Sequence, residues 1–269
     1  MSASALPPYQ VEAFNTSKES ENKIHDDTVA RRFGFAGGLV PGVDVYGYMT
    51  HMPLARWGRA WLERGTATCR LLKPVYDGEI AIVTARETAD GLSIEVASRD
   101  MLCATGTAAL PAAASFAPAL DSFAAPPAPP ADRPPADETS LAVGALLGME
   151  PLLVTPDFAA TYLREVRETD PLYAREGLVH PATLLRAGNW VLRHNVVLGP
   201  WIHVASAVRN LAAARVGQTI TARGRVTANY DHKGHRFVEL ELLVLADGAT
   251  AVAHIAHTAI YRPRQVMAA

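Results

Sequence analysis

The chain has 269 residues, of which 49% are hydrophobic and 19% are charged, and its formal net charge is −2. This length is sufficient for one large domain or two small ones with a sizeable core. The small net charge gives no electrostatic basis for binding nucleic acid or an anionic membrane. No apolar run approaches the roughly 20 residues that a transmembrane helix needs. The composition therefore predicts a globular protein with neither kind of partner.

Cellular location is predicted from the N-terminus and the cysteines. The first residues, Met-Ser-Ala-Ser-Ala-Leu-Pro-Pro, lack both the basic start and the apolar run of a signal peptide. Two cysteines, Cys69 and Cys103, are too few for a disulfide framework. We expect reduced core thiols in a cytoplasmic protein.

The segment Ser20–Gly42 is the first that indicates chemistry. It places His25 ahead of a glycine-rich turn, and an apolar helical stretch follows Gly42. A helix start exposes unpaired backbone N–H groups and the positive end of the helix dipole, which suits a developing oxyanion. A histidine beside it can transfer protons near neutral pH. The sequence predicts a proton-transfer site at this turn.

Each half of the chain is predicted to contain a helix followed by strands. The first helix is expected over Val43–Glu63, kinked or divided at Pro53, and the second over Pro181–His194. The strands expected after the first helix are Ala67–Leu72, Glu79–Glu87, Leu92–Arg99 and Leu102–Leu110, and those after the second are Trp201–Leu211, Thr219–Tyr230, Arg236–Leu245 and Ala251–Tyr261. His254 and His257 lie three apart on the last strand and so face opposite sides, which argues against a shared metal ion.

A proline-rich stretch separates the halves, which are similar to each other. The predicted linker is 113–137, between an N-terminal unit 1–112 and a C-terminal unit 138–269, and it contains Pro126-Pro127-Ala128-Pro129-Pro130. Gly38-Leu39-Val40 recurs as Gly177-Leu178-Val179, and Gly78 recurs as Gly217. The spacing is the same in both cases, 139 residues (177 minus 38, and 217 minus 78). A constant spacing indicates duplication of one unit.

Ser20 to Gly42 resembles the hydratase motif of MaoC-like hotdog proteins, the (R)-specific enoyl-CoA hydratases and acyl dehydratases. That motif reads Asp-x-Asn-Pro-Ile-His and is followed by a glycine-rich turn. Asn22, Ile24 and His25 match it, whereas Lys23 replaces the proline and Ser20 stands at the position of the acid. The resemblance implies an α+β double hotdog, with two repeats that each wrap a long central helix in an antiparallel sheet.

The resemblance also implies a function. It implies a hydratase or dehydratase, a lyase of fatty acid metabolism, whose substrate is an acyl thioester of coenzyme A or of a carrier protein. No metal or redox cofactor is implied. His25 would transfer the proton and the Gly42 N–H would polarise the thioester carbonyl. The residues expected at the catalytic centre are His25, Ser20, Asn22 and Gly42, and those expected to bind substrate are Gly37, Gly38, Val40 and Tyr46.

The sequence departs from the motif in both halves. A serine hydroxyl is not a base near pH 7 without an activating partner, so Ser20 leaves the acid unassigned. Glu19 or Glu21 could supply a carboxylate after a one-residue shift of the loop. In the second half the acid position holds Glu168, but Tyr173 replaces the histidine. Its helix begins at Pro181, which has no N–H to donate.

Two other functions stay open from the sequence. One is a non-catalytic acyl-binding protein that kept the pocket and lost the acid. The other is a hotdog thioesterase, which needs a carboxylate near the helix start, and Asp44 is the candidate. Acyl chain length and head group cannot be read from the residues. Since a fused pair already supplies a hotdog dimer, a homodimer of the whole chain is optional.

Overall fold

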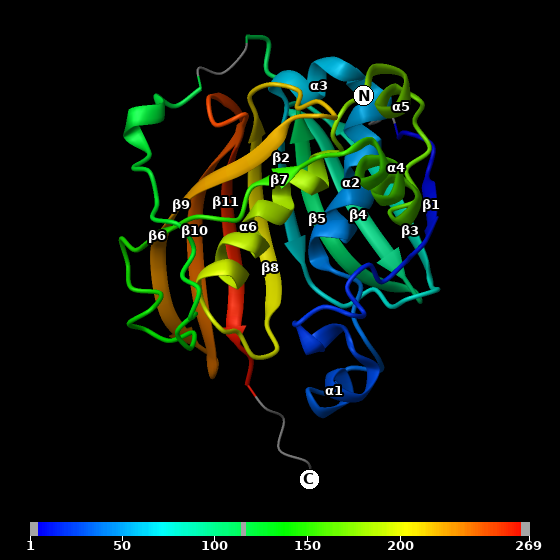
Figure 1. Ribbon diagram of the computed structural model, residues 1–269. Helices are drawn as coiled ribbons and strands as arrows, with labels where there is room; N and C mark the ends of the chain where they lie inside the picture. Colours follow the sequence, from blue (N-terminus) through cyan, green and yellow to red (C-terminus); the bar gives the residue numbers. More distant parts are fainter. Residues whose placement is uncertain (1–4, 114–116, 265–269) are drawn as a thin grey trace.

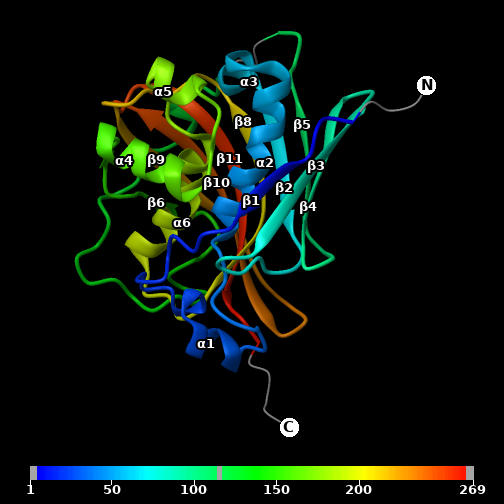
Figure 2. The ribbon, with the colours of Figure 1, turned by 90° about the vertical axis from the view of Figure 1, so that its right-hand side faces the viewer.

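Two long helices lie side by side against one face of a single large sheet. The computed structural model describes residues 5–113 and 117–264. Helix α2 spans Gly42–Trp57 and helix α6 spans Pro181–Asn195, and each packs on the strands of its own half. Figure 1 shows the two helices in front of the sheet, with the strands of the second half at the left and those of the first half at the right, and Figure 2 shows the arrangement from the side.

The sheet in the described residues has eleven strands. Ten lie in the order β1-β3-β4-β5-β2-β8-β11-β10-β9-β6, and β7 pairs with β9. All the pairings are antiparallel. In the first half the strands are β1 (Tyr9–Glu12), β2 (Thr66–Leu71), β3 (Ile80–Thr88), β4 (Gly91–Ser98) and β5 (Met101–Ala109). In the second half they are β6 (Leu146–Leu147), β7 (Leu152–Leu153), β8 (Ile202–Asn210), β9 (Thr219–His232), β10 (His235–Ala246) and β11 (Thr250–Arg262).

The halves meet through β2 and β8 at the centre of the sheet. Thr68 pairs directly with Ala207, which is its counterpart at the 139-residue spacing, so an approximate two-fold axis passes between them. Isolated bridges keep the same spacing, because Leu39 pairs with Tyr76 and Leu178 pairs with Arg215. The predicted double hotdog is confirmed.

The first long helix is divided at a different place from the one predicted. Pro53 lies inside α2, and the division falls at Gly58, before the short helix α3 (Arg59–Arg64). Gly58 has a φ of +58°, a left-handed conformation that costs a residue without a Cβ little. Its N–H still bonds to the carbonyl of Leu54, 2.7 Å away, and so closes the last turn of α2. The conformation of this glycine therefore ends α2.

Several short elements were not predicted from the sequence. They are the helices η1 (Lys23–His25), α1 (Asp27–Arg32), η2 (Leu120–Ser122), α4 (Pro156–Glu165) and α5 (Leu172–Glu176), and the strands β1, β6 and β7. The predicted linker 113–137 contains η2, and three of its positions, 114–116, lie outside the described residues. So do residues 1–4 and 265–269 of the predicted units.

The core is continuous across both halves. Nearly the whole circumference of α2 is buried, including Tyr46, Met49 and Met52, as expected of a helix that a sheet surrounds. Cys69 and Cys103 are buried and free. None of the helices in the described part of the chain is long and apolar enough to cross a membrane.

Candidate active site

His25 is held by its own backbone turn and by the glycine-rich segment. It ends η1, and its Nδ1 lies 2.6 Å from the carbonyl oxygen of Leu39. Because a carbonyl only accepts hydrogen bonds, Nδ1 carries the hydrogen and Nε2 presents a lone pair. The Asn15 amide donates to the His25 carbonyl at 2.9 Å and fixes the turn from the other side. Nε2 is therefore the basic atom of this ring.

Asn22 links His25 to the second repeat. Its Nδ2 lies 3.3 Å from His25 Nε2 and donates to the Trp201 carbonyl at 3.0 Å, while its Oδ1 accepts from the Trp201 N–H at 3.2 Å. Asn22 and His25 are both buried. Burial lowers the pKa of His25, although its bond to the Leu39 carbonyl and the charge of Asp44 oppose this. The imidazole is therefore neutral and able to accept a proton at pH 7.

A largely apolar cavity of about 240 Å³ opens beside His25. Asn22, His25, Val40 and Gly42 border it. Further walls come from both repeats, namely Phe35, Leu71, Leu72, Val75, Ile202, His203, Val204 and Ile260. An apolar cavity with a few polar groups at one end suits an acyl chain with a polar head.

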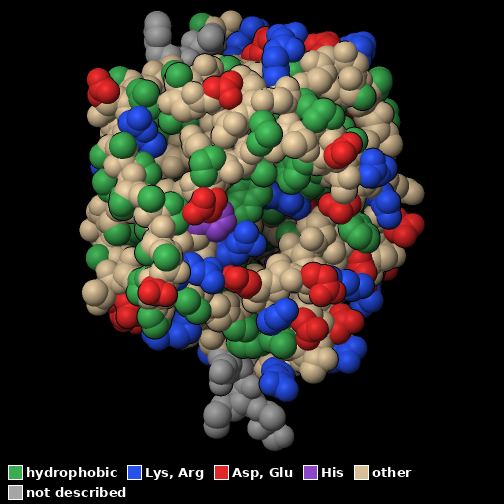
Figure 3. Space-filling view, in the orientation of Figure 1, with side chains coloured by type: hydrophobic (Ala, Val, Ile, Leu, Met, Phe, Trp, Pro, Cys, Tyr) green, Lys and Arg blue, Asp and Glu red, His purple; other side chains and the backbone are tan. Residues whose placement is uncertain are grey.

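A second cavity of about 300 Å³ also borders His25. The two cavities share Asn22, His25, Pro41, Asn189 and Trp201. The second is more polar and adds Ser20, Glu19, Arg186 and Arg193. Figure 3 shows a hollow near the middle of the face that Figure 1 presents, with positively charged side chains beside it. His25 thus borders both an apolar and a polar compartment.

Gly42 places a backbone donor at the apolar cavity. As the first residue of α2 its N–H has no partner within the helix, and none of the other described residues accepts it. A Cβ at this position would lie 2.2 Å from Leu71 Cδ1 and 2.9 Å from His203 Nδ1. A glycine is therefore required for the helix start to approach these side chains. The equivalent residue of α6, Pro181, has no N–H.

No carboxylate hydrogen-bonds to His25 among the described residues. Ser20 borders the polar cavity, and its hydroxyl lies 3.4 Å from the Asn22 carbonyl. Glu19 borders the same cavity but is exposed. Glu21 pairs instead with Arg133 at 3.0 Å. The position of the acid is thus occupied by a hydroxyl, with an exposed glutamate nearby.

The four residues predicted to bind substrate lie in three different places in the structure. Val40 borders the apolar cavity, whereas Gly37 and Gly38 border a surface depression near Asp27. A Cβ on Gly38 would lie 2.1 Å from the His25 carbonyl oxygen, so this glycine lets the turn pack against the histidine backbone. Tyr46 lies in the core, away from both cavities, and its hydroxyl has no partner among the described residues.

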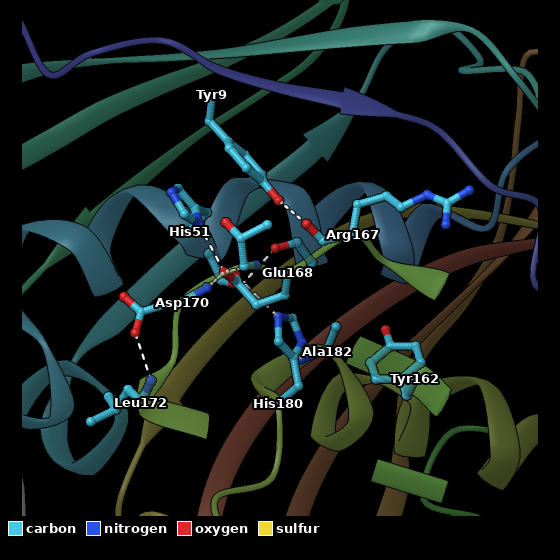
Figure 4. Close-up of polar contacts among 12 residues, drawn as sticks. Tyr9, His51, Tyr162, Arg167, Glu168, Asp170, Leu172, His180 and Ala182 are labelled. Carbon is cyan, nitrogen blue, oxygen red and sulfur yellow. Dashed lines mark hydrogen bonds and ion pairs between the residues drawn. The ribbon is translucent and has the colours of Figure 1, made fainter. Parts of the chain in front are cut away.

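The second repeat keeps the acid but encloses it. The Leu172 N–H donates to Asp170 at 2.8 Å, as the Ile24 N–H does to Asn22, so both copies form the same local turn. Glu168 accepts from His51 at 2.9 Å and lies 3.8 Å from His180 (Figure 4). The Glu168 side chain is only 2% exposed, and it borders neither cavity. This carboxylate joins the repeats and does not reach His25.

Asp44, the candidate base of a thioesterase, is fully engaged. It is 0% exposed and pairs with Arg186 at 3.0 Å. The hydroxyls of Thr16 and Tyr162 donate to its two oxygens at 2.6 and 2.8 Å. It borders neither cavity, so it is not available to activate a nucleophile there.

Sequence reasoning missed His203, which borders the apolar cavity beside Gly42. Residues three apart on a regular strand face opposite sides, yet His203 Nε2 lies 2.8 Å from Ser206 Oγ. The register of β8 against β11 shifts at Val204, a bulge that returns both side chains to one face. The sequence carries no signal of this bulge. In the described residues no group of three or more His, Cys, Asp or Glu side chains is arranged to hold a metal ion.

Comparisons with known proteins match this geometry at the level of the fold. No protein-family model matches the sequence, and a search of curated proteins finds no relative. A structure described as a MaoC domain dehydratase from Chloroflexus aurantiacus aligns with 97% of this chain and 95% of its own, at 11% identity and a TM-score of 0.62. A Mycobacterium tuberculosis protein described as a double hotdog aligns over 96% of both chains, at 16% identity and a TM-score of 0.65. A third, described as a MaoC-like dehydratase, covers 95% of this chain and 97% of its own, at 13% identity and a TM-score of 0.60.

Proposed function

We propose that this chain is a hydratase or dehydratase that adds water to, or removes it from, an α,β-unsaturated acyl thioester. One observation carries the proposal: His25, whose Nε2 is basic, and Gly42, whose N–H has no partner among the described residues, line the same apolar cavity. A hydration site needs a base for water and a donor for the thioester oxygen, and this cavity offers both. The MaoC-like dehydratases with the same fold support this reaction class.

The geometry supports a two-step proton transfer. Water attacks the β-carbon as His25 Nε2 takes one of its protons, and the C=C electrons move toward the thioester oxygen, where the Gly42 N–H stabilises the developing charge. The imidazolium then returns one proton to the α-carbon, which gives the 3-hydroxyacyl thioester. The bond from Nδ1 to the Leu39 carbonyl stabilises the imidazolium in between.

The polar compartment would supply the water. Ser20 and His25 border it together, so a water held there would lie near the hydroxyl of Ser20 and the imidazole of His25. Because no carboxylate in the described part of the chain hydrogen-bonds to His25, we expect slower turnover than an Asp–His pair would give.

A second candidate is binding of an acyl thioester without chemistry. It is favoured by the contact of Asn22 Nδ2 with His25 Nε2 at 3.3 Å, because that donor competes with water for the only lone pair of the ring. A thioesterase has no comparable support, since Asp44 is held by Arg186, Tyr162 and Thr16.

Hydration of crotonyl-CoA, followed as the loss of enoyl absorbance, tests the proposal. We expect turnover by the wild type and a fall of at least about 100-fold in His25→Gln. His254→Gln is the matched control, because His254 contacts Glu241 and borders neither cavity. Equal turnover in His25→Gln would remove His25 from the mechanism. Binding without turnover by the wild type would favour the acyl-binding alternative, and thiol release would indicate a thioesterase.

A further inference from the structure

One face of α6 borders the polar cavity and carries two arginines. The residues of this helix that line the cavity are Arg186, Asn189, Trp190 and Arg193. Side chains at this spacing lie on one side of a helix. The residues between them, 187–188 and 191–192, do not line the cavity. The lining is therefore made by side chains that extend from this face, and both arginines extend toward the polar cavity.

The first repeat has no arginines at the equivalent positions. At the repeat spacing of 139 residues, the counterparts of Arg186 and Arg193 on α2 are Gly47 and Leu54 (186 minus 139, and 193 minus 139). Both counterparts are buried in the core. The two cations thus occur only on the helix that borders the cavity of His25, which indicates a role at this site and not in the shared fold.

Arg186 uses one guanidinium nitrogen for the protein. Its Nη2 donates to Thr16 at 2.9 Å and to Asp44 at 3.0 Å, whereas its Nε and Nη1 donate to none of the described residues. The side chain is 17% exposed. Burial lowers the pKa of His25, and the charge of Arg186 adds to this effect. The guanidinium therefore lies near the ring of His25 and retains donors for a ligand.

Arg193 finds no acceptor among the described residues. Its Nη2 lies 3.4 Å from His194 Nε2, and the Glu150 N–H donates to His194 Nδ1 at 3.0 Å. Burial and the charge of Arg193 lower the pKa of His194, so this ring is neutral at pH 7. A neutral ring that accepts at Nδ1 carries its hydrogen on Nε2. Two donors therefore face each other, and the Arg193 guanidinium is left for another acceptor.

The polar cavity is short of negative charge. Glu19 is the carboxylate among the described residues that line it, and Glu19 is exposed. Asp44 balances Arg186 from outside the lining, but Arg193 has no ion pair in the described part of the chain. An anion in this cavity would therefore form charge-assisted hydrogen bonds with guanidinium groups, which match the planar geometry of a carboxylate.

The proposed orientation of the acyl thioester leads toward these arginines. Gly42 borders the apolar cavity alone, whereas His25 borders both cavities. The thioester carbonyl at Gly42 thus lies on the apolar side, and the β-carbon at His25 lies where the two cavities meet. The substituent on the β-carbon continues into the polar cavity, beside the water.

We propose that the polar cavity binds a carboxylate at the far end of the acyl group, with Arg193 and Arg186 as its donors, so that the substrate is the thioester of a dicarboxylic acid. This inference rests on the proposed acyl-thioester substrate. The phosphates of coenzyme A are also anionic, but the pantetheine arm separates them from the sulfur. Because Arg186 lies near His25, where the acyl group reacts, an anion at these arginines belongs to the acyl group.

Binding of saturated thioesters tests this site without any reaction. Glutaryl-CoA carries a terminal carboxylate, and 5-methylhexanoyl-CoA has an isopropyl group of the same shape in its place. We expect the wild type to bind glutaryl-CoA at least about tenfold more tightly in isothermal titration calorimetry. Arg193→Gln should lose most of this preference, and Arg193→Lys, which keeps the charge, should retain part of it. Arg225→Gln is the matched control, because Arg225 pairs with Glu241 and borders neither cavity.

Thioesters of pantetheine, which lacks the phosphates, identify the source of the anion. A preference for glutaryl-pantetheine that depends on Arg193 would support the acyl site. Equal affinity of the wild type for the two acyl groups would overturn the inference. So would a loss in Arg193→Gln that is the same for both CoA thioesters and absent for both pantetheine thioesters, because Arg193 would then bind the phosphates.

Hydration of glutaconyl-CoA, the unsaturated form of glutaryl-CoA, separates this inference from the proposed reaction. We expect the ratio of its kcat/KM to that of 5-methylhex-2-enoyl-CoA to fall about 10- to 100-fold in Arg193→Gln. A carboxylate preference in binding, without hydration by the wild type, would retain the anion site and reject the hydratase. Hydration with no preference for the carboxylate would retain the hydratase and reject the anion site. A wild type that binds none of these thioesters would reject both.

Discussion

Asp44, at the start of α2, and Arg186, on α6, form a buried ion pair of 3.0 Å that joins the central helices of the two repeats. Hydroxyls from Thr16 and Tyr162 complete the shell of the carboxylate. The guanidinium also lies over the Tyr162 ring, 4.3 Å from its centroid. Because these charges are buried, the loss of one partner leaves the other uncompensated.

Removal of one member of this pair should destabilise the protein strongly. We expect Asp44→Asn to reduce the free energy of unfolding by about 3–5 kcal/mol, measured by urea denaturation. The double variant Asp44→Asn/Arg186→Met should lose less than the sum of the single losses, because no unpaired charge is left. The exposed pair Arg59–Glu176 is the control, and Arg59→Met should leave the free energy of unfolding nearly unchanged, because solvent screens this pair. A small loss in Asp44→Asn would mean that water reaches this pair.

A methyl group at Gly42 should disrupt the packing of the first residue of α2 against its neighbours. The Cβ of Gly42→Ala would overlap Leu71 Cδ1 at 2.2 Å, which displaces the side chain or the helix. We expect a loss of about 1–3 kcal/mol in thermal or urea unfolding, together with weaker binding of butyryl-CoA. Gly199→Ala is the control, because its Cβ would meet nothing within 4 Å. Equal stability and equal binding in both variants would show that the helix start is less tightly packed than described.

A carboxylate at position 20 should increase the activity. Ser20 borders the polar cavity with His25, so the side chain of Ser20→Asp can reach the water that His25 activates. We expect kcat on crotonyl-CoA to rise about tenfold or more, since a positioned general acid or base contributes about 10²–10⁴-fold. Ser20→Asn, of similar size without the charge, should not gain activity. Equal rates in the two variants would mean that a carboxylate at this position does not assist His25.

Glu168 should make the stability of the protein depend on pH in the acid range. Burial opposes its ionisation, but the contacts with His180 and His51 prevail and hold the pKa of Glu168 well below its usual 4.5. A carboxyl whose pKa is lower in the folded state contributes stability above the unfolded pKa and loses it as pH falls further. Urea unfolding should therefore show stability falling below pH 4.5. Glu168→Gln should flatten this slope and cost about 3 kcal/mol at pH 7. An unchanged slope would assign the acid sensitivity to other carboxyls.

Most of the fold could be predicted because its signals are local or periodic. Each end of β2, β8 and α6 lies within one residue of its predicted position. The alternation of a strand and the capping residues of a helix are local patterns that can be read from the sequence. The repeat spacing of 139 residues indicated two copies of one unit. In the structure Thr68 and Ala207, which are 139 residues apart, pair directly across β2 and β8. Pro53 shows the limit of local rules, because a glycine five residues later divides the helix instead.

The site was less accessible to prediction because half of it comes from the other repeat. Asn22 and His25 could be found from their motif, but the contact of Asn22 with Trp201 joins residues far apart in the sequence. His203 depends on a bulge, and the burial of Asp44 depends on Arg186 across the helix pair. Tyr46 follows Gly42 by one helical turn, yet the sheet encloses it in the core, while Val45 borders the cavity.

The direct pairing of β2 with β8 places both partners of a hotdog pair on one polypeptide. Two identical subunits would have to carry the same residue at both helix starts, and they would separate on dilution. Here Gly42 and Pro181 occupy the equivalent starts, and the link between the halves makes their association intramolecular. The pairing of these halves should therefore not depend on protein concentration. Each copy is also free to change its side chains without altering the other.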